Sequence, residues 1–392
     1  MEANTISKKT ARIFEIPEIG EGEKAALQRI EELRRQLRHY VAERRRWVGV
    51  VRRVLGARAI RGSNSIEGFN VSVEDAIAAI EGAEPSEARS RDWQAVMGYR
   101  RAMTYVLQLA NDEHFNYTPE LIRSLHFMMT EYDLEASPGL WRPGPIWIRN
   151  DGSGDVVYEG PDGEDVPNLI AALVRQADTE DEAHPMIRGA MAHLNLAMIH
   201  PFRDGNGRMA RCLQTLVLAR DAILAPEWSS IEEYLGVNTE AYYRVLADVG
   251  QGGWHPENDA RPWVRFCLQA HYIQAASVLR RAKESEGIWA GVDDLRELHS
   301  LHDRTLPNLF DATIGLRLRN ASYRSNVEHF EGEEISNQVA TNDLRTLVNL
   351  ELLEKRGQKR GTFYVASKQL RDIHQRVRSD REPIDASELF AF

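Results

Sequence analysis

The segment from residue 200 to residue 211, which reads HPFRDGNGRMAR, combines side chains that could hold a phosphate and move a proton. Apolar residues recur at helical spacing on both sides, so we expect a loop that ends at the N-terminus of a helix. Gly205 and Gly207 allow the loop backbone to turn its N–H groups inward. With the positive end of the helix dipole, those groups form a nest for an anion.

The charged residues of the segment fit the same chemistry. Arg208 and Arg211 lie three residues apart, nearly on one face of the predicted helix, and point back toward the nest. Asp204 would repel a phosphate unless a hard cation such as Mg²⁺ bridged the two. His200 closes the other end, where its imidazole could take a proton from an incoming hydroxyl. The segment therefore predicts transfer of a nucleotide phosphate group to a hydroxyl.

A simple helix connection, with an Asp-Gly turn and two salt-bridged arginines, explains any one of these residues equally well. It does not explain the set, because the pattern H-x-F-x-D-G-N-G-R-x-x-R arises by chance in such a chain with a frequency on the order of 10⁻⁷ or less. We interpret Pro201 and Phe202 structurally, as residues that set the turn and anchor the loop in the core.

The pattern resembles the signature of the Fic family, whose members mostly transfer AMP from ATP to hydroxyl side chains of proteins. The resemblance covers residues 60–285 and implies that His200 is the general base and Asp204 the Mg²⁺ ligand. It assigns nucleotide binding to a set of loop and helix residues: Phe202, Arg203, Asp204, Gly205, Asn206, Gly207, Arg208, Arg211 and Tyr242.

Within that set, the resemblance gives each phosphate its own partners. Asn206 and the loop amides would hold the α-phosphate, Arg208 the β-phosphate and Arg211 the γ-phosphate. Gly207 stands where kinase-like relatives carry lysine and bind the nucleotide reversed, which favours AMP transfer. Phosphocholine transfer, a rare variant in the family, stays open.

A second short motif, Ser63-Asn64-Ser65-Ile66-Glu67-Gly68, resembles the inhibitory motif S/T-x-x-x-E-G/N of the same family. The resemblance implies that Glu67 pairs with Arg211 and denies the γ-phosphate its place. The alternative is a glutamate that caps a helix end locally, with Ser63 as a turn residue.

Helical periodicity predicts that most of the chain is α-helical. One long helix is expected over residues 22–57, followed by a loop with Gly62 and Gly68 and a helix capped by Ser72. Further helices are expected at 90–110, 118–132, 166–178, 185–199, 207–224, 239–249 and 261–282. Two β-prone runs at 146–148 and 156–158 flank residues 150–154 and predict a β-hairpin, which looks like the family's target-docking flap.

The C-terminal residues 313–366 resemble a winged helix, with helices at 313–327 and 341–353, a turn between Gly357 and Gly361, and a strand at 362–365. Residues 351–378 hold eight Lys/Arg and three acids, a local charge of +5 in a chain of net charge -10. DNA contact through residues 313–378 and a protein–protein or homodimer interface are both consistent with this pattern.

The expected fold class is mostly α, with a helical Fic core, a hairpin flap and a small C-terminal winged-helix domain. We expect a regulatory segment at 1–110, the catalytic core at 111–285 and the winged helix at 286–392. The acidic balance, with a pI near 5.7, argues against a nucleic-acid binder of the whole chain.

The sequence also bears on the compartment. Two cysteines, Cys212 and Cys267, suggest buried thiols in a reducing compartment, and no stretch reaches the ~20 apolar residues of a membrane span. The first residues lack the apolar core of a secretory signal, so we expect a cytoplasmic protein.

The leading functional hypothesis is AMP transfer from ATP to a Ser, Thr or Tyr hydroxyl of a target protein, or of the chain itself, held in check by Glu67. Removal of AMP from the same target, with Glu67 positioning water, is one alternative. A DNA-binding regulator that only senses nucleotide is another. The intact base His200 argues against the latter, because sensing requires the anion nest alone.

Overall fold

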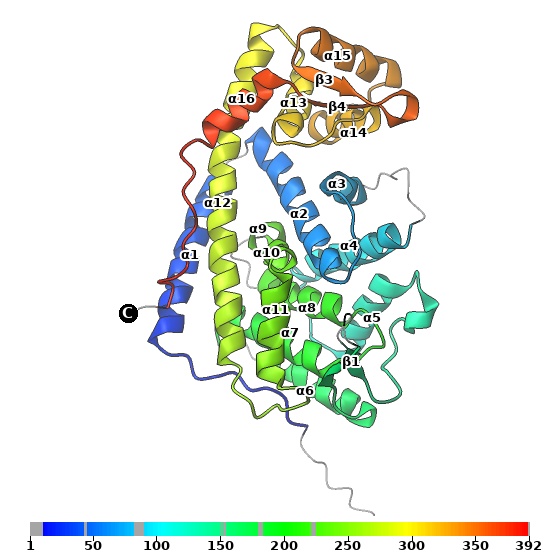
Figure 1. Cartoon of the computed structure of the whole chain (residues 1–392), viewed down its shortest axis with the longest axis vertical. Coiled ribbons are helices and arrows are strands. Elements are labelled where there is room, and N and C mark those ends of the chain that lie inside the picture. The colour runs from blue at the N-terminus through cyan, green and yellow to red at the C-terminus, as the bar shows by residue number, and fades with distance from the viewer. Residues whose placement is uncertain are drawn as a thin grey trace, which may run out of the picture.

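The computed structural model describes residues 11–42, 45–81, 90–149, 152, 154–178, 183–220 and 225–390. These described residues form sixteen α-helices and two small two-stranded sheets, which confirms the mostly α fold class. Figure 1 shows a long helix running along one side of a helical body, with a smaller unit stacked on its C-terminal end. No described helix is long and apolar enough to cross a bilayer.

The N-terminal region contains two helices, α1 (Glu21–Ala42) and α2 (Arg46–Ile66), so the prediction of one helix over residues 22–57 was wrong. The two helices have different partners: α1 packs along α12, whereas α2 packs against α3 and α10. Each of the two helices has its own stripe of buried apolar residues, so the apolar periodicity of the sequence continues across the break between them and does not reveal it. Residues 43 and 44 lie outside the described part of the chain.

Helix α2 also runs further than predicted, so residues 61–66 are helical and not part of a loop. Gly62 lies inside this helix, where an added Cβ would come 2.5 Å from the carbonyl oxygen of Glu232. The glycine therefore permits close packing of α2 against α10 (Glu232–Val237). The chain leaves the helix at Glu67 and Gly68, whose φ is +81°.

The next helices agree with the predicted ones. Ser72 caps α3 (Val73–Glu81) by accepting a hydrogen bond from the Asp75 N–H. The core then consists of α4 (Arg91–Leu109), α5 (Pro119–Thr130), α6 (Val166–Asp178), α7 (Pro185–Ile199) and α8 (Asn206–Arg220). Residues 221–224, the predicted end of the last helix, lie outside the described residues. Helices α7 and α8 are almost entirely buried and lie at the centre of this core.

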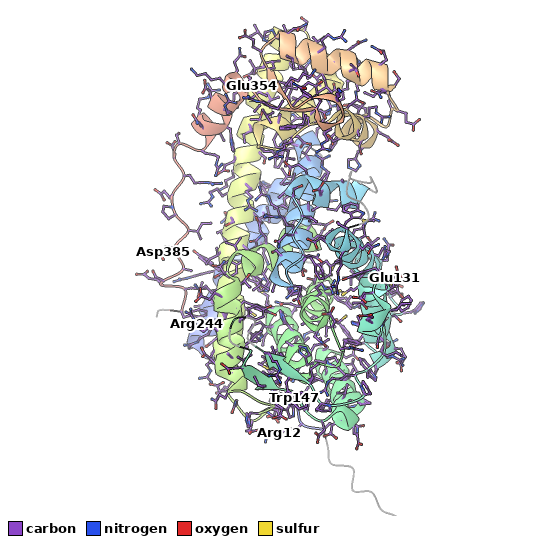
Figure 2. All side chains as sticks on the ribbon, turned by 45° about the vertical axis from the view of Figure 1, so that its right-hand side comes forward. Arg12, Glu131, Trp147, Arg244, Glu354 and Asp385 are labelled. Atoms are coloured by element: carbon purple, nitrogen blue, oxygen red, sulfur yellow. The ribbon has the colours of Figure 1, made fainter. Side chains whose placement is uncertain are left out.

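The predicted hairpin is confirmed: β1 (Trp147–Arg149) pairs antiparallel with β2 (Val156–Glu159), while residues 150, 151 and 153 of its turn lie outside the described chain. The Tyr158 hydroxyl anchors the hairpin by donating to the Met198 carbonyl oxygen at 2.7 Å. Trp147 is 47% exposed, and Figure 2 shows it at the opposite end of the molecule from Glu354.

Three helices follow α8, namely α9 (Pro226–Ser229), α10 and α11 (Thr239–Gly250). They precede α12 (Arg261–Leu298), which is longer than the predicted helix at 261–282. The expected domain boundary between residues 285 and 286 falls inside α12. This helix packs on α1 and α7 in its first part and reaches α13 and α16 in its last, so one rigid element belongs to both units.

The C-terminal unit contains α13 (Leu306–Thr313), α14 (Asn320–Glu331), α15 (Asn337–Asn349), β3 (Leu353–Arg356), β4 (Phe363–Ala366) and α16 (Lys368–Val377). Strands β3 and β4 are antiparallel, and Leu318 forms a bridge to Tyr364. The predicted helix at 313–327 was wrong at its start, because the chain turns at Gly315 (φ +98°) to make this bridge. Short 3₁₀ turns occur at Leu134–Ala136, Gly163–Asp165, Asp303–Thr305 and Lys359–Gly361.

Candidate active site

The phosphate loop, residues 200–205, joins α7 to α8. His200 ends α7 in the left-handed conformation (φ 51°), and Gly205 adopts φ +77° just before α8 begins. Asn206 closes the loop: its Oδ1 accepts from the Phe202 N–H and its Nδ2 donates to the Phe202 carbonyl oxygen, each at 2.9 Å. Both polar atoms of the Asn206 side chain are thus engaged in holding the loop closed.

Phe202 anchors the loop in the core, as the sequence predicted. Its ring is fully buried and stacks on His126 with a centroid distance of 3.6 Å and an interplanar angle of 2°. The Gly139 N–H donates to Nδ1 of His126, and Nε2 of His126 donates to the Asp204 carbonyl oxygen, both at 2.9 Å. Burial lowers the pKa of His126 to about 4, in keeping with this neutral imidazole. His126 therefore fixes the loop backbone.

His200 lies with its imidazole in the form that a general base needs. Its Nδ1 is 3.2 Å from the Ala197 carbonyl oxygen, which can only accept, so Nδ1 carries the proton and Nε2 keeps its lone pair. Burial lowers the pKa of His200 to about 4, so the ring is neutral near pH 7.

Arg142 fixes the backbone at the same point. Its Nε donates to the His200 carbonyl oxygen at 2.8 Å, and its backbone N–H donates to that of Pro201 at 2.9 Å. Its guanidinium also reaches the carbonyl oxygens of Gly144 and Pro161, and burial lowers its pKa. Arg142 therefore ties the end of α7 to the segment that leads into the hairpin.

Arg208 and Arg211 are both buried, with 0% and 1% of their surface exposed. The Arg208 guanidinium lies over the Phe69 ring at 4.9 Å, and its Nη1 is 3.4 Å from the Tyr132 hydroxyl. Within the described chain, Nε and Nη2 of Arg208 and Nη1 of Arg211 have no hydrogen-bond partner. A buried charged donor without an acceptor is costly, so these groups fit an anion that is to be bound there.

Glu67 is the carboxylate that reaches Arg211. Its Oε1 accepts a hydrogen bond from Nη2 of Arg211 at 2.8 Å. Ser63 holds the same guanidinium, because Nε donates to its Oγ at 2.7 Å and Nη2 to its carbonyl oxygen at 2.9 Å. Burial alone would lower the pKa of Arg211, but the nearby Glu67 carboxylate raises it well above the ordinary value. A side chain at Gly207 would collide with Oε1 of Glu67, which places that oxygen directly against the loop.

Asp204 is the accessible acid of the loop. Its side chain is 47% exposed, its Oδ1 accepts the Gly205 N–H at 2.7 Å, and its Oδ2 lies 4.0 Å from Nη2 of Arg208. Arg203 beside it is exposed. Across the described chain, no three His, Cys, Asp or Glu residues cluster as a metal site. Mg²⁺ commonly binds through one or two carboxylates together with substrate phosphates, and a single accessible Asp204 fits that mode.

Tyr242, which the resemblance assigned to the nucleotide, lies in the core. It is 2% exposed, and its hydroxyl is 3.0 Å from Nε2 of His193. Burial raises the pKa of Tyr242 to about 12. The neighbouring Tyr243 is 49% exposed and donates to the Ile66 carbonyl oxygen at 3.3 Å. The structure therefore brings the loop residues, Ser63 and Glu67 together, whereas Tyr242 is buried beside His193.

Residues 116–218 match the family model described as "Fic/DOC family". This part of the chain is therefore a Fic domain.

Two relatives match a longer part of the chain. The protein adenylyltransferase Fic of Nematostella vectensis is 26% identical over 251 residues, which cover 63% of this chain and 53% of the relative. The protein adenylyltransferase fic-1 of Caenorhabditis briggsae is 26% identical over 227 residues, covering 57% and 41%. The matched region thus spans about half or less of each relative.

Solved structures share the fold. A Fic family protein from Desulfovibrio desulfuricans G20 superposes with a TM-score of 0.55 and 22% identity, covering 90% of this chain and 98% of that one. A Fic domain containing signaling protein from Bacteroides thetaiotaomicron VPI-5482 gives 0.52 and 20%, covering 67% and 97%.

Proposed function

We propose that this protein transfers AMP from ATP to a Ser, Thr or Tyr hydroxyl of a target protein, and that Glu67 inhibits the transfer. One observation carries the proposal. Buried arginine N–H groups without a partner among the described residues converge on the N-terminus of α8, and a neutral histidine stands at the other end of the same loop. The relatives named protein adenylyltransferase support the same activity.

In the proposed reaction the target hydroxyl oxygen attacks the α-phosphorus of ATP. The bond from that phosphorus to the bridging oxygen breaks, and pyrophosphate leaves. Nε2 of His200 accepts the hydroxyl proton. Such a base contributes about 10²–10⁴-fold, whereas positioning and charge stabilisation supply most of the acceleration in phosphoryl transfer. Here the loop amides and Arg208 serve that second role.

Asp204 is the residue that would hold Mg²⁺ in this site. The ion supplies charge neutralisation on the phosphate oxygens when it is bound. Arg208 and the α8 N-terminus provide the remaining positive charge from the chain itself.

The proposed inhibition follows from the contact of the Glu67 carboxylate with the Arg211 guanidinium. Holding an enzyme about 99% inactive takes about 2.7 kcal/mol of bias, whereas an exposed ion pair supplies about 0–1 kcal/mol. The Glu67–Arg211 pair is better placed than an exposed one, because Arg211 is buried and Ser63 fixes its orientation. An ATP γ-phosphate that needs Arg211 must displace this carboxylate.

Removal of AMP from a modified target is a second candidate at the same site. The Glu67 side chain is 21% exposed, so it could orient a water molecule that attacks the phosphorus. AMP transfer and AMP removal can be distinguished by their requirement for ATP. Transfer consumes ATP, whereas removal requires only the modified target and water.

We also propose that the C-terminal unit is a winged helix that contacts DNA. Its α15 presents exposed Gln338, Asn342, Arg345 and Asn349, side chains that can hydrogen-bond base edges in a major groove. The exposed Lys355 and Arg356 at the end of β3 lie beside the turn and could contact phosphates.

The direct test of the AMP transfer is the intact mass of the purified protein after incubation with ATP and Mg²⁺. We expect an added AMP on the Glu67→Gly chain, in which the proposed inhibition is relieved, and none on Glu67→Gly combined with His200→Ala. Measurable incorporation that is equal in these two proteins would refute the assignment of His200.

A further inference from the structure

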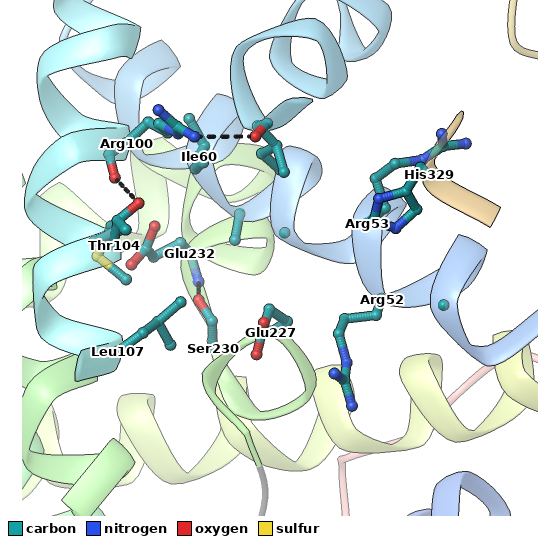
Figure 3. Close-up of a pocket in the computed structure, with 15 residues that line it drawn as sticks. Arg52, Arg53, Ile60, Arg100, Thr104, Leu107, Glu227, Ser230, Glu232 and His329 are labelled. Carbon is teal, nitrogen blue, oxygen red and sulfur yellow. Dashed lines mark hydrogen bonds between the residues drawn. The ribbon is translucent and has the colours of Figure 1, made fainter. Parts of the chain in front are cut away.

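A cavity of about 370 Å³ lies away from the phosphate loop, between α2, α3, α4 and the α9–α10 segment (Figure 3). His329 of α14 lines it from the C-terminal unit. No residue of the 200–211 segment is among its lining residues. Its size suits a small organic ligand.

Most of the cavity wall is apolar, with Ile60, Ile80, Met103 and Leu107 among the lining residues. Gly56 contributes to this wall from the interior of α2, a position where glycine weakens a helix. An added Cβ there would make ordinary contacts, at 3.4 Å from Ile80 Cδ1 and 3.7 Å from Glu227 Cγ. Packing therefore does not require glycine at this position, and a larger side chain would fill the cavity.

Glu232 is a buried acid that opens onto this cavity, and only 2% of its surface is exposed. Its Oε1 accepts hydrogen bonds from the Tyr99 hydroxyl at 2.9 Å and from Thr215 Oγ1 at 3.1 Å. Its Oε2 has no partner within the described chain, and the same holds for Oε2 of Glu227, which also lines the cavity. Two residues that line the same cavity thus each carry a buried acceptor without a donor among the described residues, which is costly unless a ligand supplies one.

Within the described chain, none of the three arginines that line the cavity, Arg52, Arg53 and Arg100, hydrogen-bonds to these two oxygens. Arg53 is held by Asp311, with Nη2 to Oδ2 at 2.5 Å, and Arg100 donates from Nη2 to the Ile80 carbonyl oxygen at 3.1 Å. Burial raises the pKa of Glu232 to about 7, and an ammonium group placed beside it would favour the ionised carboxylate.

We propose that this cavity binds a small apolar molecule that carries a primary ammonium group. The ammonium donates to Oε2 of Glu232 and Oε2 of Glu227, and the apolar body packs against Ile60, Met103 and Leu107. Such charge-assisted hydrogen bonds in an apolar space give both affinity and selection for the amine. No residue of the 200–211 segment lines this site, although the Arg211 guanidinium is near enough to Glu232 to lower the pKa of that carboxyl against the larger effect of burial.

The test measures the binding of phenethylamine, used as the probe, to the full chain. Binding is monitored by ligand-observed NMR in the absence of nucleotide. Phenethyl alcohol, which has the same shape without the charge, is the control ligand. We expect saturable binding of the amine in the millimolar range, and binding of the alcohol that is at least about tenfold weaker.

Two variants locate the binding. Glu232→Gln removes the charge, and Gly56→Leu fills the cavity. We expect each to weaken phenethylamine binding by about tenfold or more while the thermal unfolding transition stays cooperative. The proposal is overturned if the wild-type chain does not bind the amine, binds the alcohol equally well, or keeps its affinity when a folded Gly56→Leu variant is used. The amine-against-alcohol comparison needs no variant, and none of these readouts depends on AMP transfer.

Discussion

Oε1 of Glu67 lies 2.8 Å from Nη2 of Arg211, and it lies directly against Gly207 in the first turn of α8. This contact joins the C-terminal end of α2 to the first turns of α8. Because Arg211 is buried and also held by Ser63, the carboxylate meets a fixed guanidinium and not a mobile surface group. The segment from Ser63 to Gly68 and the phosphate loop therefore lie together in one site.

His200→Ala should abolish AMP transfer and leave ATP binding nearly intact, because the imidazole acts on the hydroxyl and not on the phosphates. Arg208→Ala is the matched contrast, since its buried guanidinium has N–H groups without a partner in the described chain, and loss of these proposed phosphate donors should weaken nucleotide binding as well. Isothermal titration with ATP and a transfer assay on the same preparations separate the two. An equal loss of ATP binding and of turnover in His200→Ala would contradict the assignment of His200 as the general base.

Asp204→Ala should remove the transfer activity together with its dependence on Mg²⁺, because Asp204 is the accessible carboxylate of the loop. The measurement is the transfer rate across a Mg²⁺ titration for both proteins. A variant whose turnover still rises with added Mg²⁺ would contradict the proposed role of Asp204.

His193 should make the fold sensitive to mild acid. Burial lowers its pKa to about 3, far below the value of about 6.5 in an unfolded chain. Below pH 6.5 the unfolded state therefore binds the extra proton, and the free energy of unfolding falls as the pH falls. From pH 7.5 to pH 5.5 this single group should remove about 1.4 kcal/mol.

Urea unfolding of the wild-type chain and of His193→Asn at both pH values checks this effect. The comparison cancels groups with the opposite sign, such as Glu232, whose pKa burial raises to about 7. We expect the loss between the two pH values to be smaller in the variant by about 1.4 kcal/mol. An identical loss in both proteins would show that His193 does not titrate in this way.

The full chain should bind duplex DNA weakly and with a steep salt dependence, because phosphate contacts release counterions. Replacing Lys355 and Arg356 by glutamate should abolish the binding and leave the Fic domain folded, since both residues are exposed in β3. Fluorescence anisotropy with a labelled duplex at several salt concentrations measures this. Absence of binding at low salt would favour a protein-interaction or homodimer module.

The local sequence was sufficient to predict most of the helices and the loop between α7 and α8. Apolar periodicity, the helix cap Ser72 and the glycines of the 200–211 segment are signals that each depend on only a few neighbouring residues. Prediction from the local sequence failed where the structure depends on packing between distant parts of the chain. Gly62 looked like a loop residue, but close packing against α10 requires it within a helix. The length of α12 likewise depends on partners in two units of the structure.

The site residues divide in the same way. The phosphate loop could be predicted because its functional residues follow one another in the sequence. His126 and Arg142 contact that loop from positions 78 and 58 residues away from their partners Asp204 and His200. One signal for His126 was present: it is a histidine on the buried face of α5, with Ile122, Leu125 and Met129. Nothing local distinguishes Arg142 from an exposed arginine, since its partners are carbonyl oxygens that only the fold brings near.

The proposed inhibition by Glu67 is tested most directly by the rate of AMP transfer in Glu67→Gly, measured with ATP and Mg²⁺ on one target or on the chain itself. We expect a rise of about tenfold or more, with little change in thermal stability, because the variant frees Arg211 for the γ-phosphate. Glu67→Asp, one methylene short, should relieve inhibition in part, and Glu67→Gly combined with His200→Ala should be inactive. Transfer by Glu67→Gly at the wild-type rate would show that the Glu67–Arg211 contact only ends a helix and does not restrain the enzyme.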